Sequence, residues 1–390
     1  METIEETKSK FNWTGVMAVS AGHFWIDYYA AILQSIVPYL VINMDLTPSR
    51  VGFAIMMTNV ATSIFQPLFG HYADTRGNIL WIPVSIFWSA AAISSVGLTN
   101  NFMVIILLSA LSGFGITLFH PLGVIEANRH AASNEGLGLS IYSLMGNLGF
   151  AVTPMIIVPL LNSFNRAGFL ISFIPGLIIS IILLMYYRNK RPAITINTVH
   201  EEVSSSSKKK VLLLTLIEIF RACGYSTLST YIALYFVSKG MSQLNAGYIQ
   251  SFFGIMSVAG LFLGGFFVNR FDIKKLMLYT MGLTIIFFLG FSFTSGAVSI
   301  LFILITAFLY RFCFNVSILA GQALLPNGKG MVTGLIMGIA PAVGSIVTFI
   351  SGIVADASGV DIAVKYTVIF AVLSFIMTLF FKPEKGAVKN

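Results

Sequence analysis

Several ionisable residues stand inside stretches of the sequence that are otherwise apolar. His23 and Asp27 are four positions apart, so they share one face if their stretch is helical. Glu218 and Arg221 are three positions apart and would also share a face. Arg311 stands alone in a later apolar stretch. Because polar groups in such surroundings cost free energy and usually mark a pathway, these residues are candidates for proton transfer and ligand binding.

Two interpretations of these groups compete. In the functional one, Asp27 or Glu218 takes up and releases a proton in each transport cycle, and His23 tunes Asp27. Arg221 and Arg311 would then receive an anionic substrate. In the structural one, Glu218 and Arg221 form a fixed pair within one helix. His23 and Asp27 then form a hydrogen bond that only holds the structure. An unpaired cation at the bilayer centre costs roughly 2.5–3.5 kcal/mol, so both arginines should face a cavity or a carboxylate.

Four further side chains complete the set of candidate substrate contacts. They are His120, Tyr28, Tyr231 and Asn147. His120 precedes Pro121 and could instead cap the broken end of its helix. The two tyrosines and Asn147 could line a cavity or hold helices together, and both roles stay open.

The composition excludes most classes of protein. Of the 390 residues, 56% are hydrophobic and 10% are charged, and the mean hydropathy is +0.87. A soluble domain has about 45–50% apolar and about 25% charged residues, so soluble enzymes, disordered proteins and nucleic-acid binders are excluded. The sequence contains no G-x-S-x-G, no P-loop lysine, no H-E-x-x-H and no Cys/His cluster. We therefore expect no enzyme, metal or cofactor, and any uphill transport would use an ion gradient.

The elements that position these residues are long apolar stretches. A transmembrane helix needs about 20 apolar residues. We expect twelve spans, at 13–41, 51–72, 79–98, 102–125, 136–160, 167–187, 211–238, 244–268, 276–295, 298–322, 330–354 and 362–381. The sequence thus predicts an all-α integral membrane protein with twelve transmembrane helices.

The longest polar stretch divides these spans into six and six. We expect an N-terminal six-helix bundle at 1–187, a cytoplasmic linker at 188–210 and a C-terminal six-helix bundle at 211–390. Of the 23 Lys and Arg residues, 17 fall on one side of the predicted membrane, four on the other and two within spans. Basic residues favour the cytoplasmic side, so both termini are predicted to be cytoplasmic.

The two halves resemble each other at a constant offset. Gly70 and Gly265 follow the second and eighth spans 195 positions apart, and His23 and Glu218 have the same separation. Two related six-helix halves with a substrate site between them at the midplane are an architecture of secondary transporters. We expect spans 1, 4, 7 and 10 to build that site, and the halves to rock about it in alternating access.

The connection between spans two and three carries the run Gly70-x-x-x-Asp74-x-Arg76-Gly77. Arg270 stands at the matching place in the second half. The run resembles the loop signature of the major facilitator superfamily, and this resemblance implies that these five residues gate the cytoplasmic side. Without it, the run would be an ordinary turn with a capping aspartate.

Further stretches resemble one branch of that superfamily, the fosmidomycin resistance proteins. They are Gly22-His23-x-x-x-Asp27, Phe119-His120-Pro121, the run from Gly146 to Pro154, Leu324-Leu325-Pro326 and the run from Gly352 to Asp356. The resemblance implies a drug:proton antiporter that causes antibiotic resistance by efflux of small drugs or organic anions. It also implies a multi-pass protein of the bacterial inner membrane, here expected to be a monomer driven by the proton gradient.

Three other functions compete with export. Proton-coupled uptake of a small metabolite or sugar would use the same fold, because the sequence does not reveal the direction. A non-transporting sensor would need a signalling domain, and the longest polar stretch is only the linker at 188–210. A channel is disfavoured, because two pseudo-repeated bundles offer no ring of identical subunits around a pore.

Overall fold

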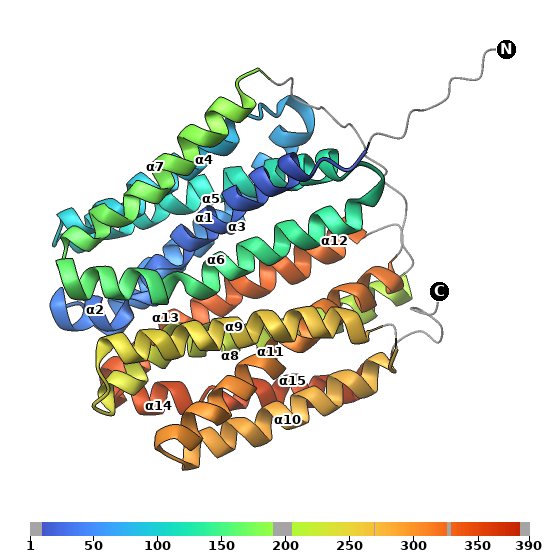
Figure 1. The fold of residues 1–390 in the computed structure, drawn as a ribbon. Coiled ribbons are helices and arrows are strands. Elements are labelled where there is room, and N and C mark those ends of the chain that lie inside the picture. The colour runs from blue at the N-terminus through green and yellow to red at the C-terminus, as the bar shows by residue number, and fades with distance from the viewer. Residues whose placement is uncertain (1–9, 190–204, 269, 326–328, 383–390) are drawn as a thin grey trace.

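The computed structural model describes residues 10–189, 205–268, 270–325 and 329–382, and the regular structure in these ranges is helical. The helices run roughly alongside one another in a single bundle (Figure 1). The first and last described residues lie at the same end of this bundle, which we call the terminal end. We call the opposite end, where α2 and α14 lie, the far end.

Residues 10–189 form the first group of helices. They are α1 (Trp13–Ser35), α2 (Val37–Asn43), α3 (Pro48–Arg76), α4 (Trp81–Ser94), α5 (Phe102–Ala131), α6 (Glu135–Phe164) and α7 (Ala167–Tyr187). Two short 3-10 turns, η1 (Ser95–Leu98) and η2 (Ala132–Asn134), extend α4 and connect α5 to α6.

The residues from 205 onward form the second group. They are α8 (Ser205–Ser238), α9 (Gln243–Phe267), α10 (Ile273–Phe293), α11 (Gly296–Leu324), α12 (Lys329–Gly334), α13 (Ala340–Ser358), α14 (Val360–Lys365) and α15 (Val368–Phe380). A π-helical turn, η4 (Leu335–Ile339), joins α12 to α13.

The predicted membrane spans are present as helices. Among the described residues, eleven helical segments are long and apolar enough to cross a membrane, and they match eleven of the predicted spans. The remaining prediction, 51–72, lies inside α3. The 29 residues of α3 would extend over about 44 Å, more than the roughly 30 Å hydrocarbon core. With α3, the structure accounts for all twelve spans.

Several boundaries differ from the prediction. The first span is broken at Ile36 into α1 and α2, beside Pro38, which cannot donate a backbone hydrogen bond. Helix α8 begins at Ser205, inside the predicted linker, while residues 190–204 of that linker lie outside the described residues. Gly70 to Arg76 belong to α3 rather than to a turn, so the connection to α4 is only 77–80.

Close helix packing is built on small residues. A Cβ atom added at Gly264 of α9 would lie 1.8 Å from the backbone oxygen of Phe312 on α11. In the first group, a Cβ at Gly113 of α5 would lie 2.5 Å from the oxygen of Thr58 on α3. Small residues let helix backbones approach in a membrane, where tight packing rather than the hydrophobic effect holds helices together.

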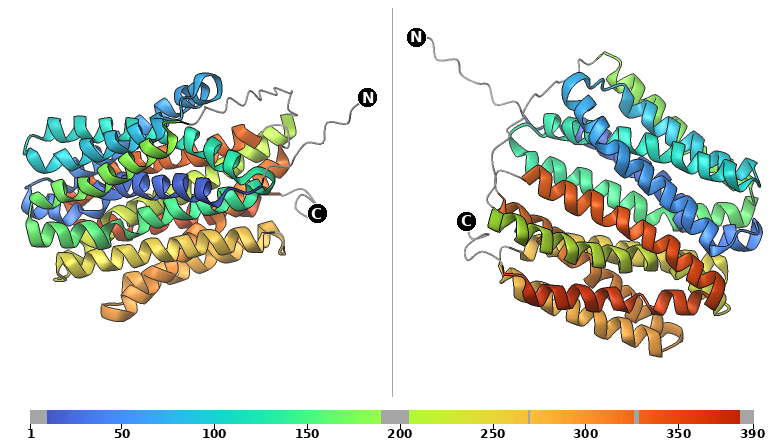
Figure 2. Two further views of the ribbon diagram at one scale, coloured as in Figure 1. Left: turned by 45° about the horizontal axis from the view of Figure 1, so that its top comes forward. Right: turned by 180° about the vertical axis from the view of Figure 1, so that it is seen from behind.

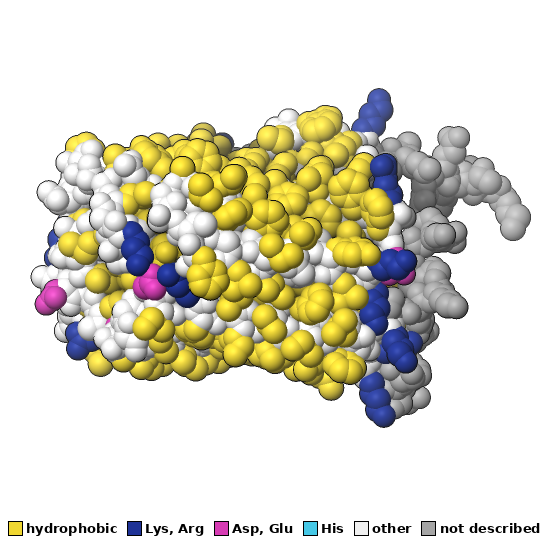
Figure 3. Space-filling view, turned by 90° about the horizontal axis from the view of Figure 1, so that it is seen from below, with side chains coloured by type: hydrophobic (Ala, Val, Ile, Leu, Met, Phe, Trp, Pro, Cys, Tyr) yellow, Lys and Arg dark blue, Asp and Glu magenta, His cyan; other side chains and the backbone are white. Residues whose placement is uncertain are grey.

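The two groups of helices meet mainly along two pairs of helices. Helix α3 packs against α13, and α6 packs against α9. Figure 2 shows this layered arrangement from two further sides, with the first group lying over the second. The surface between the two ends is largely covered by hydrophobic side chains (Figure 3). On this face Lys and Arg gather at the terminal end, with a smaller group at the far end.

Candidate functional site

A cavity of about 280 Å³ lies between the two groups of helices. Its polar lining side chains from the first group are Asp27, Gln34, Thr58, Asn59 and Asn147. Those from the second group are Glu218, Arg221, Tyr225, Ser226, Ser229, Ser257, Tyr310 and Arg311. The structure therefore brings five of the predicted site residues, from both halves, to one central space.

Asp27 lies between two histidines. Its Oδ2 atom is 3.3 Å from Nε2 of His23, one turn earlier on α1, and its Oδ1 atom is 3.6 Å from Nε2 of His120 on α5. The Asp27 side chain is 18% exposed, and no Lys or Arg contacts it among the described residues. The predicted pair on α1 is present, and His120 joins it from a second helix. The carboxylate can therefore share protons with either imidazole while facing the cavity.

His23 packs against α6. Its Nδ1 atom is 2.8 Å from the backbone oxygen of Tyr142, and its ring stacks on the Tyr142 ring at 3.9 Å between centroids. Gly146 lies one turn further along α6, and a Cβ atom there would come within 2.4 Å of the imidazole. Tyr142 was not among the predicted site residues, because its contact with His23 joins residues 119 positions apart.

Glu218 and Arg221 are bound to each other and to their neighbours. The Arg221 guanidinium donates to the Glu218 carboxylate and to the backbone oxygen of Tyr310. The hydroxyl of Ser317 on α11 donates to the same Glu218 oxygen at 2.5 Å. Both charged side chains are almost fully buried. This geometry is that of the fixed pair, although both residues also line the cavity.

Arg311 has a different environment. Its guanidinium carbon lies 4.4 Å from the ring centroid of Phe314 and 5.1 Å from that of Tyr225. No hydrogen bond or ion pair to Arg311 is formed by the described residues. As expected from the cost of an unpaired cation in a membrane, both Arg221 and Arg311 face the cavity. Only Arg311 has all its N–H donors available to a ligand.

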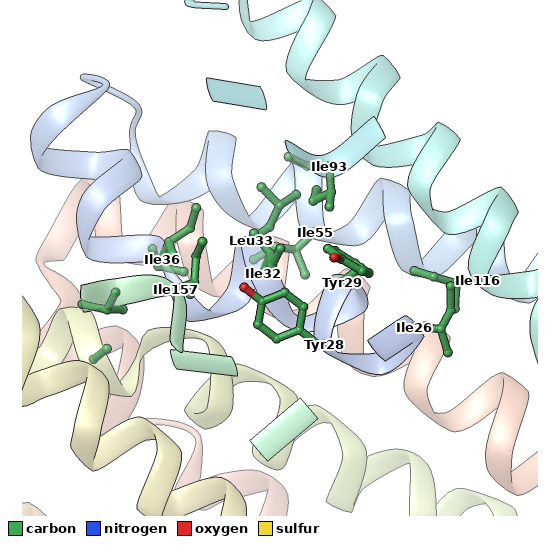
Figure 4. Close-up of a cluster of buried hydrophobic side chains, with 14 of the residues drawn as sticks. Ile26, Tyr28, Tyr29, Ile32, Leu33, Ile36, Ile55, Ile93, Ile116 and Ile157 are labelled. Atoms are coloured by element: carbon green, nitrogen blue, oxygen red, sulfur yellow. The ribbon is translucent and has the colours of Figure 1, made fainter. Parts of the chain in front are cut away.

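The remaining predicted substrate contacts divide into two sets. Asn147 lines the cavity, and its amide nitrogen donates to the backbone oxygen of Ser143 at 2.8 Å. Tyr28 lies away from the cavity, fully buried in the apolar cluster between the helices of the first group (Figure 4). Tyr231 is also buried, and its hydroxyl lies 3.0 Å from the Pro48 oxygen and 3.2 Å from the Thr348 oxygen. The structure does not bring either tyrosine to the cavity.

The predicted gating residues lie at the terminal end. A Cβ atom at Gly70 would meet nothing within 4 Å, so no helix approaches closely there, whereas Gly77 is buried directly after α3. The side chains of Asp74 and Arg76 lie outside the described residues. Arg270 is exposed, with its guanidinium 4.3 Å from the centroid of the Phe266 ring. These positions leave the gating role a prediction.

The cluster around Asp27 is also the one group that could geometrically hold a metal ion among the described residues. One ligand atom each of His23, Asp27 and His120 lies within 4.8 Å of the others. These atoms are already within hydrogen-bonding or ion-pairing range of each other, and no fourth His, Cys, Asp or Glu of the described chain joins them. Our expectation remains that the site works with protons alone.

Two polar groups were not singled out as functional by sequence reasoning. One is a hydrogen-bonded set in which Gln34 donates to the Ser229 hydroxyl, and Gln250 Nε2 donates to the backbone oxygens of Gln34 and Ser229 at 2.9 and 2.8 Å. The other is Glu126, which is buried and accepts from Arg129 at 2.5 Å. The i, i+3 spacing of Glu126 and Arg129 was a usable signal, but Glu126 fell just outside the predicted span.

The hydrogen bonds between the two groups of helices lie on one side of the cavity. Besides Gln34 with Ser229 and Gln250, they join Ser49 to Asp356, Met155 to Ser251, Tyr231 to Pro48, and Gln243 to Asn43. Asn43 ends α2, Ser49 lies in the first turn of α3, and Asp356 lies in the last turn of α13 before α14, so these contacts are at the far end. The cavity is therefore closed toward the far end.

Two groups of membrane-crossing helices around a polar central cavity define a membrane transporter. The sequence profile of the Major Facilitator Superfamily matches residues 19–329, and the chain belongs to this superfamily. The fold and the family expected from the sequence are both confirmed.

Comparisons over the whole chain agree with this assignment. The chain is 24% identical to the fosmidomycin resistance protein of Escherichia coli (strain K12) over 385 residues, covering 96% of this chain and 94% of that protein. It is 25% identical to the uncharacterized MFS-type transporter YfnC of Bacillus subtilis (strain 168), covering 91% and 90% of the two chains. The chain is thus similar, over nearly its whole length, to a protein of the branch that the sequence motifs resemble.

Solved structures share the fold. A bacterial homolog of the human lysosomal transporter Spinster, in an inward-facing and occupied conformation, superposes with a TM-score of 0.80 over 94% of this chain and 96% of that one, at 14% identity. The xylose transporter XylE from E. coli, in an inward-open conformation, gives a TM-score of 0.75 over 96% and 97%, at 15% identity.

Proposed function

We propose that this protein is a proton-coupled secondary transporter that exports small organic anions by alternating access. The observation that carries the proposal is that two ionisable groups, Asp27 and Arg311, line the same central cavity. Within the described chain, Asp27 contacts only histidines among charged groups, and Arg311 contacts aromatic rings without an acidic partner. Asp27 is the proton carrier, and Arg311 binds the anionic group of the substrate.

The cavity suits a small ligand. Its volume of about 280 Å³ is just below the range for drug-binding pockets, which is roughly 300–1,000 Å³. Tyr225 and Phe314 flank the Arg311 guanidinium, so an anion bound there would be surrounded by aromatic rings. Asn59 and Asn147 supply amide groups on the opposite wall. We expect the substrate to carry one anionic group and several polar ones.

Export requires the proton and the substrate to exclude each other. An anion on Arg311 alone would bind better when Asp27 is protonated, because protonation removes a negative charge from the same cavity. A substrate that also donates a hydrogen bond to the Asp27 carboxylate would instead compete with the proton. We propose that exported substrates have both features, and the likeness to the fosmidomycin resistance protein supports this direction.

The electrostatics of the cavity are also compatible with one alternative function, which is uptake. An anion without a hydrogen-bond donor for Asp27 would bind together with a proton, which would make the protein an uptake system. The two functions differ in the effect of pH on substrate binding. Acidification weakens binding in the exporter and strengthens it in the uptake system.

We further propose how the molecule is oriented and how it moves. With the terminal end in the cytoplasm, most Lys and Arg residues lie on the side that the positive-inside rule assigns to them. The far end is then the outer side of the bacterial inner membrane, and this conformation is closed to the outside. The bundles at 1–187 and 211–390 rock as units of one monomer, driven by the proton gradient without a cofactor.

Drug susceptibility of an efflux-deficient bacterial host tests the proposal. We expect the native chain to raise resistance to fosmidomycin or another small anion. Asp27→Asn should abolish this resistance while the protein stays in the membrane, because an amide cannot carry the proton. Asp45→Asn is the matched control, since Asp45 lies outside the cavity and its positive φ of 53° suits asparagine. Normal gradient-driven transport in Asp27→Asn would overturn the proton-carrier role.

A further inference from the structure

The pair of His23 and Asp27 is packed against one short stretch of α6. The Tyr142 backbone oxygen lies 2.8 Å from Nδ1 of His23, and the Tyr142 ring covers the imidazole face at an interplanar angle of 20°. One turn later, a Cβ atom at Gly146 would lie 2.5 Å from Nε2 of His23 and 2.6 Å from Oδ2 of Asp27. Only glycine leaves room for the pair at this place.

The contact with Tyr142 decides which nitrogen of His23 carries a proton. A backbone carbonyl oxygen can only accept, so Nδ1 must donate to it. In the neutral imidazole the other nitrogen, Nε2, then has a lone pair and no hydrogen. This lone pair faces Oδ2 of Asp27 at 3.3 Å. Two acceptors at that distance repel each other unless one proton lies between them.

We propose that His23 and Asp27 together store a single proton between Nε2 and Oδ2, and that Tyr142 and Gly146 on α6 position the pair for this. The inference rests on the proposed function and deepens it, because the carrier becomes the pair rather than Asp27 alone. Tyr142 and Gly146 are positioning residues. Their contribution is to hold the imidazole in one tautomer and at one distance from the carboxylate.

This geometry explains how the pair takes up and releases its proton. A proton from water in the cavity enters between Nε2 and Oδ2 and makes the contact a charge-assisted hydrogen bond. When that proton returns to water, the lone pair and the carboxylate face each other and the contact is broken. Asp27 then turns toward His120, whose Nε2 lies 3.6 Å from Oδ1. The two positions of the carboxylate link proton release to a movement at the cavity wall.

Other titratable groups face this pair from every helix around it. They are His120 on α5, Tyr142 on α6, Tyr187 on α7 beside Tyr142, and, across the cavity, Glu218 and Arg221 on α8 and Arg311 on α11. Glu218 and Arg221 balance each other, and an arginine stays charged at all relevant pH values. His120 is therefore, besides the pair itself, the group at this site that can exchange a proton.

The state of His23 can be observed without knowing the substrate. The full chain, labelled with ¹⁵N-histidine and purified in detergent with EDTA present, is titrated by NMR, and His23→Ala identifies the signals of His23 among the five histidines. We expect Nδ1 of His23 to keep its hydrogen throughout the titration, while Nε2 alone gains and loses one. Loss of the hydrogen from Nδ1, or no change in the Nε2 signal in Asp27→Asn, would overturn the inference.

Two glycines on α6 provide a matched pair of variants. Gly146→Ala should push the imidazole away from the carboxylate and shift the pH at which Nε2 gains its hydrogen. Gly136→Ala, whose Cβ would meet nothing within 4 Å, should titrate as the native chain does. Equal midpoints in all three proteins would contradict the positioning role. If Gly146→Ala does not fold, the tautomer of His23 in the native protein is the test of the proposal.

A double variant distinguishes a positioning role of Gly146 from general damage to α6. In a chain that already carries His23→Ala, a Cβ atom at Gly146 would meet only the Asp27 carboxylate, so adding Gly146→Ala should affect the pH dependence of transport less than it does in the native chain. The proposed function fails if Asp27→Asn transports normally, whatever the tautomer. The stored-proton pair alone is contradicted if Asp27→Asn is inactive but the neutral His23 imidazole carries its single hydrogen on Nε2 instead of Nδ1.

Discussion

At the scale of single residues, the two arginines that line the cavity have different surroundings. Arg221 donates to Glu218 and to the backbone oxygen of Tyr310, and it is 3% exposed. Arg311 lies against Phe314 and Tyr225 and keeps its N–H groups unpaired within the described chain. Cation–π contacts stabilise a charge without using its donors. We therefore assign anion binding to Arg311 and a structural role to Arg221.

Arg311→Gln should weaken the binding of anions roughly ten-fold or more, because a hydrogen bond to a charged group contributes about 1.5–3 kcal/mol. Neutral compounds of similar size should lose much less. Binding to the purified protein, measured by calorimetry, compares the two kinds of ligand. Arg50→Gln is the control, since Arg50 also lies over an aromatic ring, Phe102, but is outside the cavity. Equal loss for anions and neutral compounds would point to a structural arginine.

At the scale of helices, glycine sets how closely α9 and α11 approach. Cβ atoms at Gly260 and Gly264 would lie 2.1 and 1.8 Å from the backbone oxygens of Phe308 and Phe312. These glycines are one turn apart and face the same neighbour, which is the small-residue spacing of tightly packed membrane helices. Because Tyr310 and Arg311 lie between the two contact points on α11, this packing also positions one wall of the cavity.

Gly264→Ala should therefore destabilise the second group of helices. Overpacking a tight contact costs typically 1–3 kcal/mol, so the unfolding temperature in detergent should fall by several degrees. Gly282→Ala on α10 is the control, because its Cβ would meet only the Phe375 ring at 3.6 Å, an ordinary contact. That variant should be as stable as the native chain or slightly more so, since alanine favours helices. An unchanged unfolding temperature in Gly264→Ala would mean that the helices separate at little cost.

At the scale of the whole molecule, the two groups meet at equivalent positions. Gln34 of α1 donates to Ser229 of α8, and these residues are separated by 195 positions, the offset of the internal repeat. Contact between equivalent residues places the axis that relates the two halves at this point. Gln250 ties the same two residues together through their backbone oxygens. The contacts that close the cavity toward the far end thus include a small hydrogen-bonded set at the axis.

Gln250→Leu keeps the volume of the side chain but removes both hydrogen bonds, so it should favour opening at the far end. We expect faster labelling of a cysteine at Ser229 by a membrane-impermeant thiol reagent added outside the cell. The buried Cys223 and Cys313 are replaced by serine in this background. Gln322→Leu is the control, because Gln322 bonds only to Thr333 within its own group in the described chain. Unchanged labelling in Gln250→Leu would show that other contacts close this side.

The sequence determined the elements and the pairs within them. Long apolar stretches fold as helices in a membrane because the backbone has no other partner for its hydrogen bonds, so the spans could be located to within a few residues. The pairs of His23 with Asp27 and of Glu218 with Arg221 follow from the helical repeat alone. The same helical repeat could also have excluded Tyr28 from the cavity. Tyr28 is about 100° around α1 from Asp27, so it could not share the cavity-lining face.

The tertiary structure decided everything that joins distant parts of the chain. His120 and Tyr142 lie beside His23 and Asp27, and Ser317 lies beside Glu218, although about a hundred residues separate the partners. No local pattern encodes such contacts, because they depend on which face of one helix packs against which face of another. The tautomer of His23, the unpaired state of Arg311 and the closure at the far end all arise from that packing. The chain therefore specifies its charged residues locally, while their chemistry depends on neighbours supplied by other helices.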